Sequence, residues 1–155
     1  MKIIKATIND IEQIEKLLYQ VHKVHSDARP DLFIAGKKKY NKEELAKIIN
    51  NKNTPIFVYK DEDIILGYAF IIYKIENANS LVNIKTMYVD DFCVDESYKH
   101  QGIGTKLFDF LKIEAKKQNC YNITLNVYNF NKAAKAFYEK QQLQELKTYM
   151  ELIVK

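Results

Sequence analysis

Hydrophobic and polar positions alternate over residues 2–8, which predicts a first strand. Apolar side chains then recur every three or four residues from Asn9 to about Ser26–Ala28, which predicts a helix. Asn9 is followed three residues later by Glu12, and Asn41 by Glu44. Such a pair is typical of a helix start, because each side chain can accept a hydrogen bond from the backbone N–H of the other residue. The first helix is therefore expected to begin at Asn9 and a second helix at Asn41.

The pattern changes to that of strands after residue 55. The apolar runs Ile56–Lys60 and Ile64–Ile75 flank a short acidic turn and predict a hairpin. Leu81–Val94 is a third extended run. From Ile103 to Lys117 the apolar residues lie four apart, which predicts a helix.

Three further elements complete the chain: a strand at Asn122–Tyr128, a helix at Asn131–Gln141 and a last strand at Leu146–Val154. The order β-α-α-β-β-β-α-β-α-β is typical of a single α/β domain over residues 1–155, with helices flanking a mixed central sheet. The stretch 84–127 is expected to form a right-handed parallel crossover.

Composition excludes several classes of protein. Hydrophobic residues make up 47% and charged residues 28%, values that favour a globular domain over a disordered one. The longest apolar run, Ile64–Tyr73, is half of the roughly 20 residues that span a membrane, so no membrane partner is expected. Because the first residues lack an apolar stretch of signal-peptide length, we expect a cytoplasmic protein.

The charge of the chain and its cysteine and histidine residues also argue against some classes of partner and cofactor. The net charge is +4 and Arg29 is the only arginine, which argues against nucleic acid as a partner. Cys93 and Cys120 are expected to be reduced thiols. His22 and His25 have a spacing that could hold a metal ion, but no third ligand is evident, so no metal is expected.

Two of the four glycines, Gly102 and Gly104, lie where a strand gives way to a helix. Glycine allows positive φ and close approach of a ligand, and the N–H groups that begin a helix bind anions such as phosphates. No third glycine follows as in a dinucleotide-binding fold, and no Gly-Lys-Ser/Thr follows as in a P-loop.

The residues around these glycines resemble a motif of a known protein family. Lys99-His100-Gln101-Gly102-Ile103-Gly104 resembles the acetyl-CoA motif of the GNAT superfamily of N-acetyltransferases, with Lys99 where Arg or Gln is usual. Asn131, Ala134, Phe137 and Tyr138 resemble the second signature of that superfamily, although Gln142-Leu143 replaces its Gly-Phe. The resemblance covers essentially the whole chain.

The resemblance implies a cleft for acetyl-CoA between splayed parallel strands. The pantetheine arm would pair with the main chain of Phe92 and Val94, and the pyrophosphate would lie on the N–H groups of residues 101–105. A side chain added at Gly104 would then stand against the phosphates. The implied binding residues are Phe92, Cys93, Val94, Lys99, His100, Gln101, Gly102, Ile103, Gly104, Thr105, Asn131 and Tyr138.

The resemblance also implies direct attack by the acceptor in a ternary complex. Tyr138 matches the family's general acid, which protonates the departing thiolate, and Asn131 would contact the pantetheine or cap its helix. The candidates for the base are Tyr88, Asp90 and Asp91. Alternation along a strand sends the two aspartates to opposite faces, so only one should point into the cleft unless a bulge intervenes.

The acceptor is expected to be a primary amine of a small molecule or peptide, which the sequence does not name. His22, His25 and Phe33 resemble residues that shape the acceptor site in some members. Cys93 is expected to be a small apolar strand residue rather than a nucleophile, because no histidine is near it in the sequence. The alternative function is a non-catalytic acyl-CoA-binding module or sensor, and either could act as a homodimer.

Overall fold

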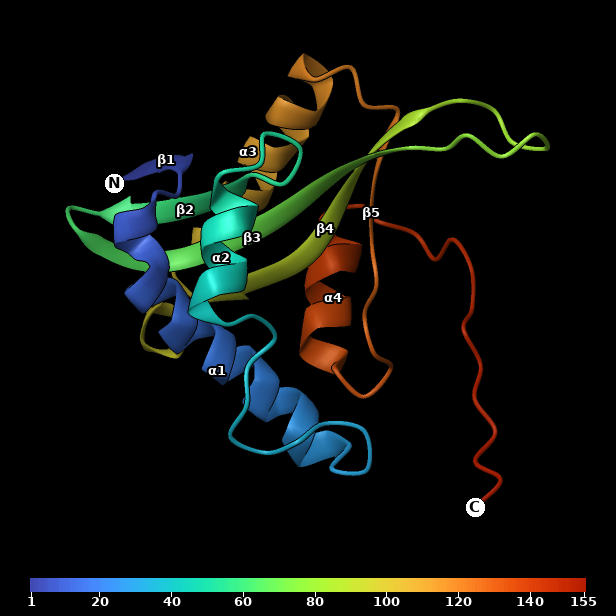
Figure 1. The fold of residues 1–155 in the computed structure, drawn as a ribbon, viewed down its shortest axis with the longest axis horizontal. Helices are drawn as coiled ribbons and strands as arrows, with labels where there is room; N and C mark the ends of the chain where they lie inside the picture. The colour runs from blue at the N-terminus through green and yellow to red at the C-terminus, as the bar shows by residue number, and fades with distance from the viewer.

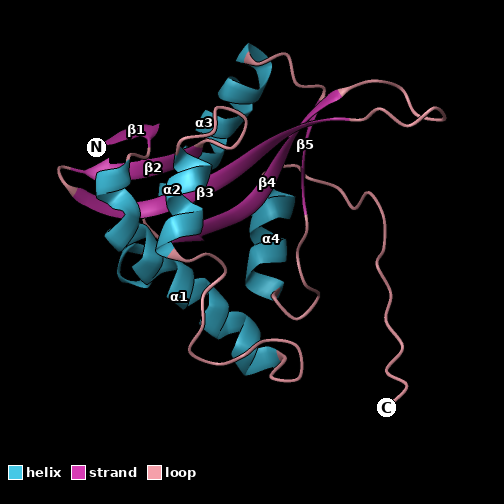
Figure 2. Cartoon of the chain, viewed as in Figure 1, coloured by secondary structure: helices cyan, strands magenta, loops and turns pink.

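The computed structural model describes residues 1–155, and a five-stranded sheet lies at its centre (Figures 1 and 2). Neighbouring strands follow the order β1-β2-β3-β4-β5, antiparallel except for the parallel pair β4 and β5. The strands are β1 (Lys2–Lys5), β2 (Ile56–Asp61), β3 (Ile64–Ile75), β4 (Lys85–Val94) and β5 (Asn122–Leu125). The predicted α/β fold with a mixed sheet is confirmed.

Helices cover both faces of the sheet. The core on one face is formed with α1 (Ile11–Ala28) and α2 (Lys42–Ile49), and the core on the other with α3 (Ile103–Lys117). Helix α4 (Lys132–Lys140) packs its aromatic side chains against the α3 core. The parallel connection from β4 through α3 to β5 is the predicted crossover, and it places the glycine turn at the end of β4.

A β-bulge interrupts the pairing of β3 with β4. Phe70 lies opposite Asp91 and Ile71 opposite Val89, so Asp90 has no partner on β3. An extra residue reverses the alternation of side chains on either side of it. Val89 accordingly packs with α3, whereas Cys93, four residues later, packs with α1.

The start of the first helix differs from the prediction. The capping box is formed by Thr7 and Asp10 rather than by Asn9 and Glu12, and a 3₁₀ turn at Ile8–Asp10 precedes α1. The physical reason is a second partner for the acid: the Asp10 carboxylate accepts the Thr7 N–H at 2.8 Å and also pairs with Lys60 of β2 at 2.5 Å. As a result β1 ends at Lys5, before the predicted residue 8.

Three other predicted strands differ from the structure. Strand β4 begins at Lys85 rather than Leu81, because its pairing with β3 starts there, opposite Ile75. Strand β5 ends at Leu125 rather than Tyr128, because it pairs with β4 over only four residues. The predicted last strand at Leu146–Val154 is wrong, since this segment pairs with no strand and runs free of the sheet (Figure 1). None of the four helices has both the length and the apolar character needed to span a bilayer.

Candidate active site

The candidate site begins where β4 and β5 separate. Their last paired residues are Val89 and Leu125, yet β4 continues to Val94 while β5 ends. Beyond this point one edge of β4 has no neighbouring strand, and this place where β4 and β5 diverge is called the gap below. The splayed parallel strands expected from the sequence are therefore present.

Hydrogen bonding to β3 decides which backbone groups face the gap. The Asp95 N–H donates to the Leu66 carbonyl at 2.8 Å, so every second residue of β4 counted back from Asp95 bonds to β3. The N–H and C=O groups of Phe92 and Val94 therefore point to the other side, toward the gap. This is the edge at which the family resemblance implies that the pantetheine arm would pair.

The glycine turn leaves several N–H groups free at the start of α3. Gly102 adopts a left-handed conformation with φ of +77° and receives no side-chain cap. The first backbone bond of the helix runs from Lys106 N–H to the Gly102 carbonyl, so the N–H groups of Ile103, Gly104 and Thr105 have no helical acceptor. A Cβ on Gly102 would meet no atom within 4 Å, so the space beside the turn is open.

Gly104 does not face that open space, contrary to expectation. A Cβ at Gly104 would lie 3.2 Å from the Phe137 Cε2 atom and 3.5 Å from the Val94 Cγ2 atom. Glycine is needed here because α3 approaches α4 and the end of β4 closely. A substitution at Gly104 would therefore disturb the packing between helices before it touched a bound phosphate.

The remaining residues of the motif fall into two groups. Lys99, His100 and Gln101 are exposed on the turn, and His100 has a positive φ of +64°. Cys93 instead is buried toward α1, with its thiol 3.9 Å from the Leu17 carbonyl oxygen and its backbone paired with β3. Burial raises the pKa of the Cys93 thiol far above its usual range, so it is not a thiolate nucleophile.

Tyr138 lies on α4 in an aromatic cluster beside the gap. Its ring centroid is 6.2 Å from that of Phe92, 6.1 Å from that of Phe108 and 5.4 Å from that of Phe137. Burial raises the pKa of the Tyr138 hydroxyl well above its usual range, and the nearby Asp91 charge adds to the effect. The hydroxyl therefore keeps its proton at neutral pH.

Asn131 caps the helix that carries Tyr138. Its Oδ1 atom accepts the Ala134 N–H at 3.2 Å, which satisfies one free donor at the start of α4. The capping role foreseen from the sequence is therefore present.

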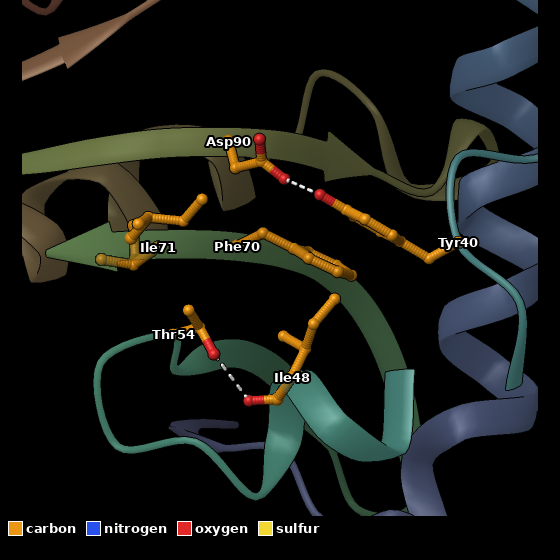
Figure 3. Close-up of a pocket in the computed structure, with 7 residues that line it drawn as sticks. Tyr40, Ile48, Thr54, Phe70, Ile71 and Asp90 are labelled. Carbon is orange, nitrogen blue, oxygen red and sulfur yellow. Dashed lines mark hydrogen bonds between the residues drawn. The ribbon is translucent and has the colours of Figure 1, made fainter. Parts of the chain in front are cut away.

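The two aspartates lie on one face of the sheet, so the prediction of opposite faces is wrong. Asp91 shares the face of Cys93, since the two are separated by one residue. Asp90 accepts a hydrogen bond from the hydroxyl of Tyr40, whose ring stacks on Phe70 at 5.6 Å on this same face (Figure 3). The bulge at Asp90 is the physical reason.

The Asp90 carboxylate is fully engaged. Besides the Tyr40 hydroxyl, it pairs with Lys39 at 3.2 Å, and the Asp90 carbonyl oxygen accepts from the same ammonium group at 2.9 Å. Tyr40 and Asp90 line a small cavity of about 40 Å³ together with residues of β3 and Ile48 of α2 (Figure 3). Ligand pockets measure roughly 300–1,000 Å³, so this cavity is no substrate site.

The Asp91 carboxylate turns to the open edge instead. It accepts the N–H of Phe92 at 2.9 Å, one of the two residues whose backbone faces the gap. Burial raises the pKa of Asp91 to about 6, although Lys39 and the Phe92 N–H act against the rise. The Tyr68 hydroxyl is fully buried near Asp91 and has no other polar partner.

Tyr88 marks the point where the strands separate. Its hydroxyl accepts a hydrogen bond from Asn126 Nδ2 at 3.1 Å, and the Lys74 ammonium lies 3.8 Å from its ring centroid. Both its hydroxyl and its ring are thus occupied by neighbours.

The three predicted acceptor residues come together at the end of α1. His25 packs 5.0 Å from Phe33, which in turn lies 5.8 Å from His22. Sequence reasoning missed Tyr128 and Phe130 of the loop before α4, whose rings lie 5.4 and 5.8 Å from His25. Their aromatic character directly before Asn131 was the available signal.

Burial lowers the pKa of His25, and the charges of His22 and Lys39 lower it further. His25 is therefore a neutral member of the aromatic cluster at neutral pH. His22 Nε2 lies 2.7 Å from the Ile34 carbonyl oxygen. No group of three or more His, Cys, Asp or Glu side chains is placed to hold a metal ion.

Asp91→Asn should stabilise the protein in a pH-dependent way. Because the native pKa of Asp91 is raised, the folded protein holds a buried charge above about pH 6, whereas both folded and unfolded states are protonated well below pH 4. The variant should therefore melt at a higher temperature at pH 8, and its advantage should shrink between pH 6 and 4. Thermal unfolding followed by circular dichroism measures this difference.

Asp90→Asn is the matched control for that experiment. It removes a charge that Tyr40 and Lys39 stabilise, so it should lower the melting temperature at pH 8. Equal destabilisation by both variants at every pH would contradict the assignment of a strained buried charge to Asp91.

Comparison with known proteins agrees with this geometry. Residues 18–142 match the model of the acetyltransferase (GNAT) family. A crystal structure of a mutant BH1408 protein from Bacillus halodurans is 31% identical, with a TM-score of 0.95 and 99% of each chain covered. No curated protein matches the chain.

More distant structures share the fold. An aminoglycoside acetyltransferase from an uncultured soil metagenomic sample, in complex with sisomicin, is 19% identical with a TM-score of 0.73, covering 99% of this chain and 96% of that one. An aminoglycoside N-acetyltransferase in complex with CoA is 12% identical with a TM-score of 0.72 and 99% coverage of each chain. The family match over most of the chain shows that this protein belongs to the GNAT acetyltransferase family.

Proposed function

We propose that the protein transfers the acetyl group of acetyl-CoA directly to a primary amine of a small molecule or peptide. The observation that supports this proposal is that candidate catalytic side chains lie close to the unpaired edge of β4. The half-buried Tyr138 ring lies 6.2 Å from that of Phe92, the Asp91 carboxylate is near enough for its charge to add to the rise that burial causes in the pKa of Tyr138, and the same carboxylate accepts the Phe92 N–H at the edge where β4 and β5 separate. The uncapped glycine turn lies at the end of the same strand.

The residues present fit acetyl-CoA. The N–H groups of Ile103, Gly104 and Thr105 are free donors beside open space, and they suit a pyrophosphate at the positive end of the α3 dipole. Lys99 and His100 are exposed on the same turn and can add charge. The backbone of Phe92 and Val94 offers strand-like pairing to the amide groups of a pantetheine arm.

Each proton then has an identified donor or acceptor. The bound thioester supplies an activated acetyl group. The acceptor nitrogen forms a bond to the carbonyl carbon while the C–S bond breaks, and Tyr138 donates its proton to the departing sulfur. The proton lost from the amine passes to Asp91, directly or through one water, and Tyr138 recovers its proton from solvent.

Asp91 suits the role of base better than the other candidates. A general base works best when its pKa lies close to the working pH, and burial raises the pKa of Asp91 to about 6. Asp90 is held by Tyr40 and Lys39, and the hydroxyl of Tyr88 is bonded to Asn126. We assign those two residues to positioning.

The aromatic cluster at the end of α1 supports an acceptor with a flat or apolar body. Side chains of His25, Phe33, Tyr128 and Phe130 gather there, and aromatic faces also attract an amine in its cationic form. The acetyltransferases of similar fold that are named for aminoglycosides support acetyl transfer to an amine, while their low identity leaves the acceptor of this chain open.

Tyr138→Phe tests the acid. The substitution keeps the ring that packs on Phe92 and Phe108 but removes the proton, so kcat should fall by about 10²–10⁴-fold while the affinity for CoA stays close to wild type. Turnover of acetyl-CoA against a panel of amines, together with calorimetric titration of CoA, gives both quantities.

Tyr73→Phe is the control, because Tyr73 is a half-buried tyrosine of β3 that packs in the same core. It should leave kcat unchanged. Wild-type turnover by Tyr138→Phe on the best acceptor would contradict the acid assignment. Tight CoA binding by the wild-type protein without turnover on any amine would favour a CoA-binding sensor instead.

The pH dependence of the rate tests the base. Wild-type kcat/KM should fall as the pH drops through about 6, because a protonated Asp91 accepts no proton. Asp91→Asn should lower the rate about 10²–10⁴-fold and remove this acidic limb, whereas Asp90→Asn should retain it. An unchanged limb in Asp91→Asn would show that another group, or the amine itself, titrates there.

A further inference from the structure

The Tyr68 hydroxyl on β3 is the only buried side-chain oxygen or nitrogen atom without a hydrogen-bond partner of ordinary geometry. Tyr68 is fully buried, and its ring lies 4.8 Å from that of Phe70 in the core that the sheet forms with α1. A phenylalanine would fill the same space without burying a polar group, whereas a buried hydroxyl without a partner destabilises a fold. An acceptor is therefore expected within reach of this hydroxyl.

Strand pairing places the Asp91 carboxylate within that reach. Tyr68 lies opposite Cys93 on β4, and Asp91 lies two residues before Cys93, opposite Phe70. Tyr68 and Asp91 are therefore diagonal neighbours on one face of the sheet, with Cα atoms about 7–8 Å apart, a separation that long side chains can bridge. Burial raises the pKa of each group, and the charge of Asp91 raises that of Tyr68 further, as expected for close neighbours.

The other acceptor beside the hydroxyl is weaker. Sulfur accepts hydrogen bonds poorly, and burial raises the pKa of the Cys93 thiol so that it keeps its proton. The Asp91 carboxylate has two oxygen atoms with several lone pairs, of which the Phe92 N–H occupies one. The carboxylate can therefore accept a second hydrogen bond from Tyr68.

The charge of Asp91 is only partly compensated by the ionised groups around it. The Lys39 ammonium favours the charged form of Asp91, but it pairs directly with Asp90, whose own charge favours the neutral form. The remaining titratable groups that Asp91 influences are neutral, because burial raises the pKa of each: Tyr40, Cys93 and Tyr138. A neutral donor such as a tyrosine hydroxyl would thus be needed to stabilise the buried charge.

We propose that Tyr68 is a positioning residue, whose hydroxyl donates a hydrogen bond to the ionised Asp91 carboxylate and holds it beside the N–H of Phe92. A hydrogen bond to the charged form favours that form, so without Tyr68 the carboxyl would ionise only at a higher pH. The contact does not depend on acetyl transfer. Its consequence, a base that is charged at neutral pH, rests on the proposed function.

Tyr68→Phe tests the contact through the titration of Asp91, followed by NMR of the side-chain carboxyl carbons in ¹³C-labelled protein. The pKa of Asp91 should rise from about 6 to about 7 or above, because a hydrogen bond to a charged group is lost. Tyr40→Phe is the matched control, since it removes a hydroxyl that bonds to Asp90 on the same face, and it should leave the pKa of Asp91 close to the wild-type value. An unchanged pKa in folded Tyr68→Phe, or an equal rise in both variants, would overturn the proposal.

A second measurement leaves Tyr68 in place. The NMR signal of the ring carbon that bears the Tyr68 hydroxyl should shift in the wild-type protein as the pH passes through about 6, where Asp91 gains its proton. Asp91→Asn should abolish this shift. A Tyr68 signal that does not respond to the titration of Asp91, or one that responds equally in Asp91→Asn, would overturn the contact.

The pH dependence of turnover separates a failure of this contact from a failure of the proposed function. If Asp91 is the base, the acidic limb of kcat/KM in Tyr68→Phe should move to higher pH together with the pKa of Asp91. A raised pKa of Asp91 with an unmoved limb would confirm the contact and contradict the role of Asp91 as the base. An unmoved pKa and an unmoved limb would overturn the positioning role of Tyr68.

Discussion

The separation of β4 from β5 after Val89 is the constraint on which the site depends. Backbone N–H and C=O groups at the edge of a sheet normally pair with a neighbouring strand, and a parallel neighbour that ends early leaves those of Phe92 and Val94 without a strand partner. The Phe92 N–H donates instead to the side chain of Asp91. The helix that follows is uncapped for a related reason, since Gly102 has no side chain to offer. The backbone edge of β4 and the start of α3 are thus both left without regular secondary-structure partners.

The bulge at Asp90 determines on which face of the sheet the two aspartate side chains lie. Without the extra residue Asp90 and Asp91 would face opposite sides of the sheet, and only one could reach the cleft. With it, Asp90 is held by Tyr40 and Lys39, while Asp91 is left beside the open edge with a raised pKa. An unstable buried charge of this kind is typical of functional sites, where stability is lost in favour of reactivity.

Local patterns in the sequence were enough for the fold but not for the details that depend on distant partners. The helices, the long strands and the turn at Gly102 follow from periodicity and from glycine chemistry. The bulge follows from pairing between β3 and β4, and the faces of the aspartates could not be known without it. The cap at Asp10 likewise depends on Lys60, which lies fifty residues away in the sequence. The final segment at Leu146–Val154 was predicted as a strand, but it pairs with no strand of its own chain.

The most direct test of the central claim is the response of individual backbone amides to CoA, followed by two-dimensional NMR of the ¹⁵N-labelled protein. The account predicts the largest shifts at the N–H groups of residues 102–105 and of Phe92 and Val94, with small shifts along β1 and α2. The Phe92 amide should also report the loss of its bond to Asp91 when a ligand takes that edge. Saturable CoA binding that shifts other amides and leaves these unchanged would contradict the account.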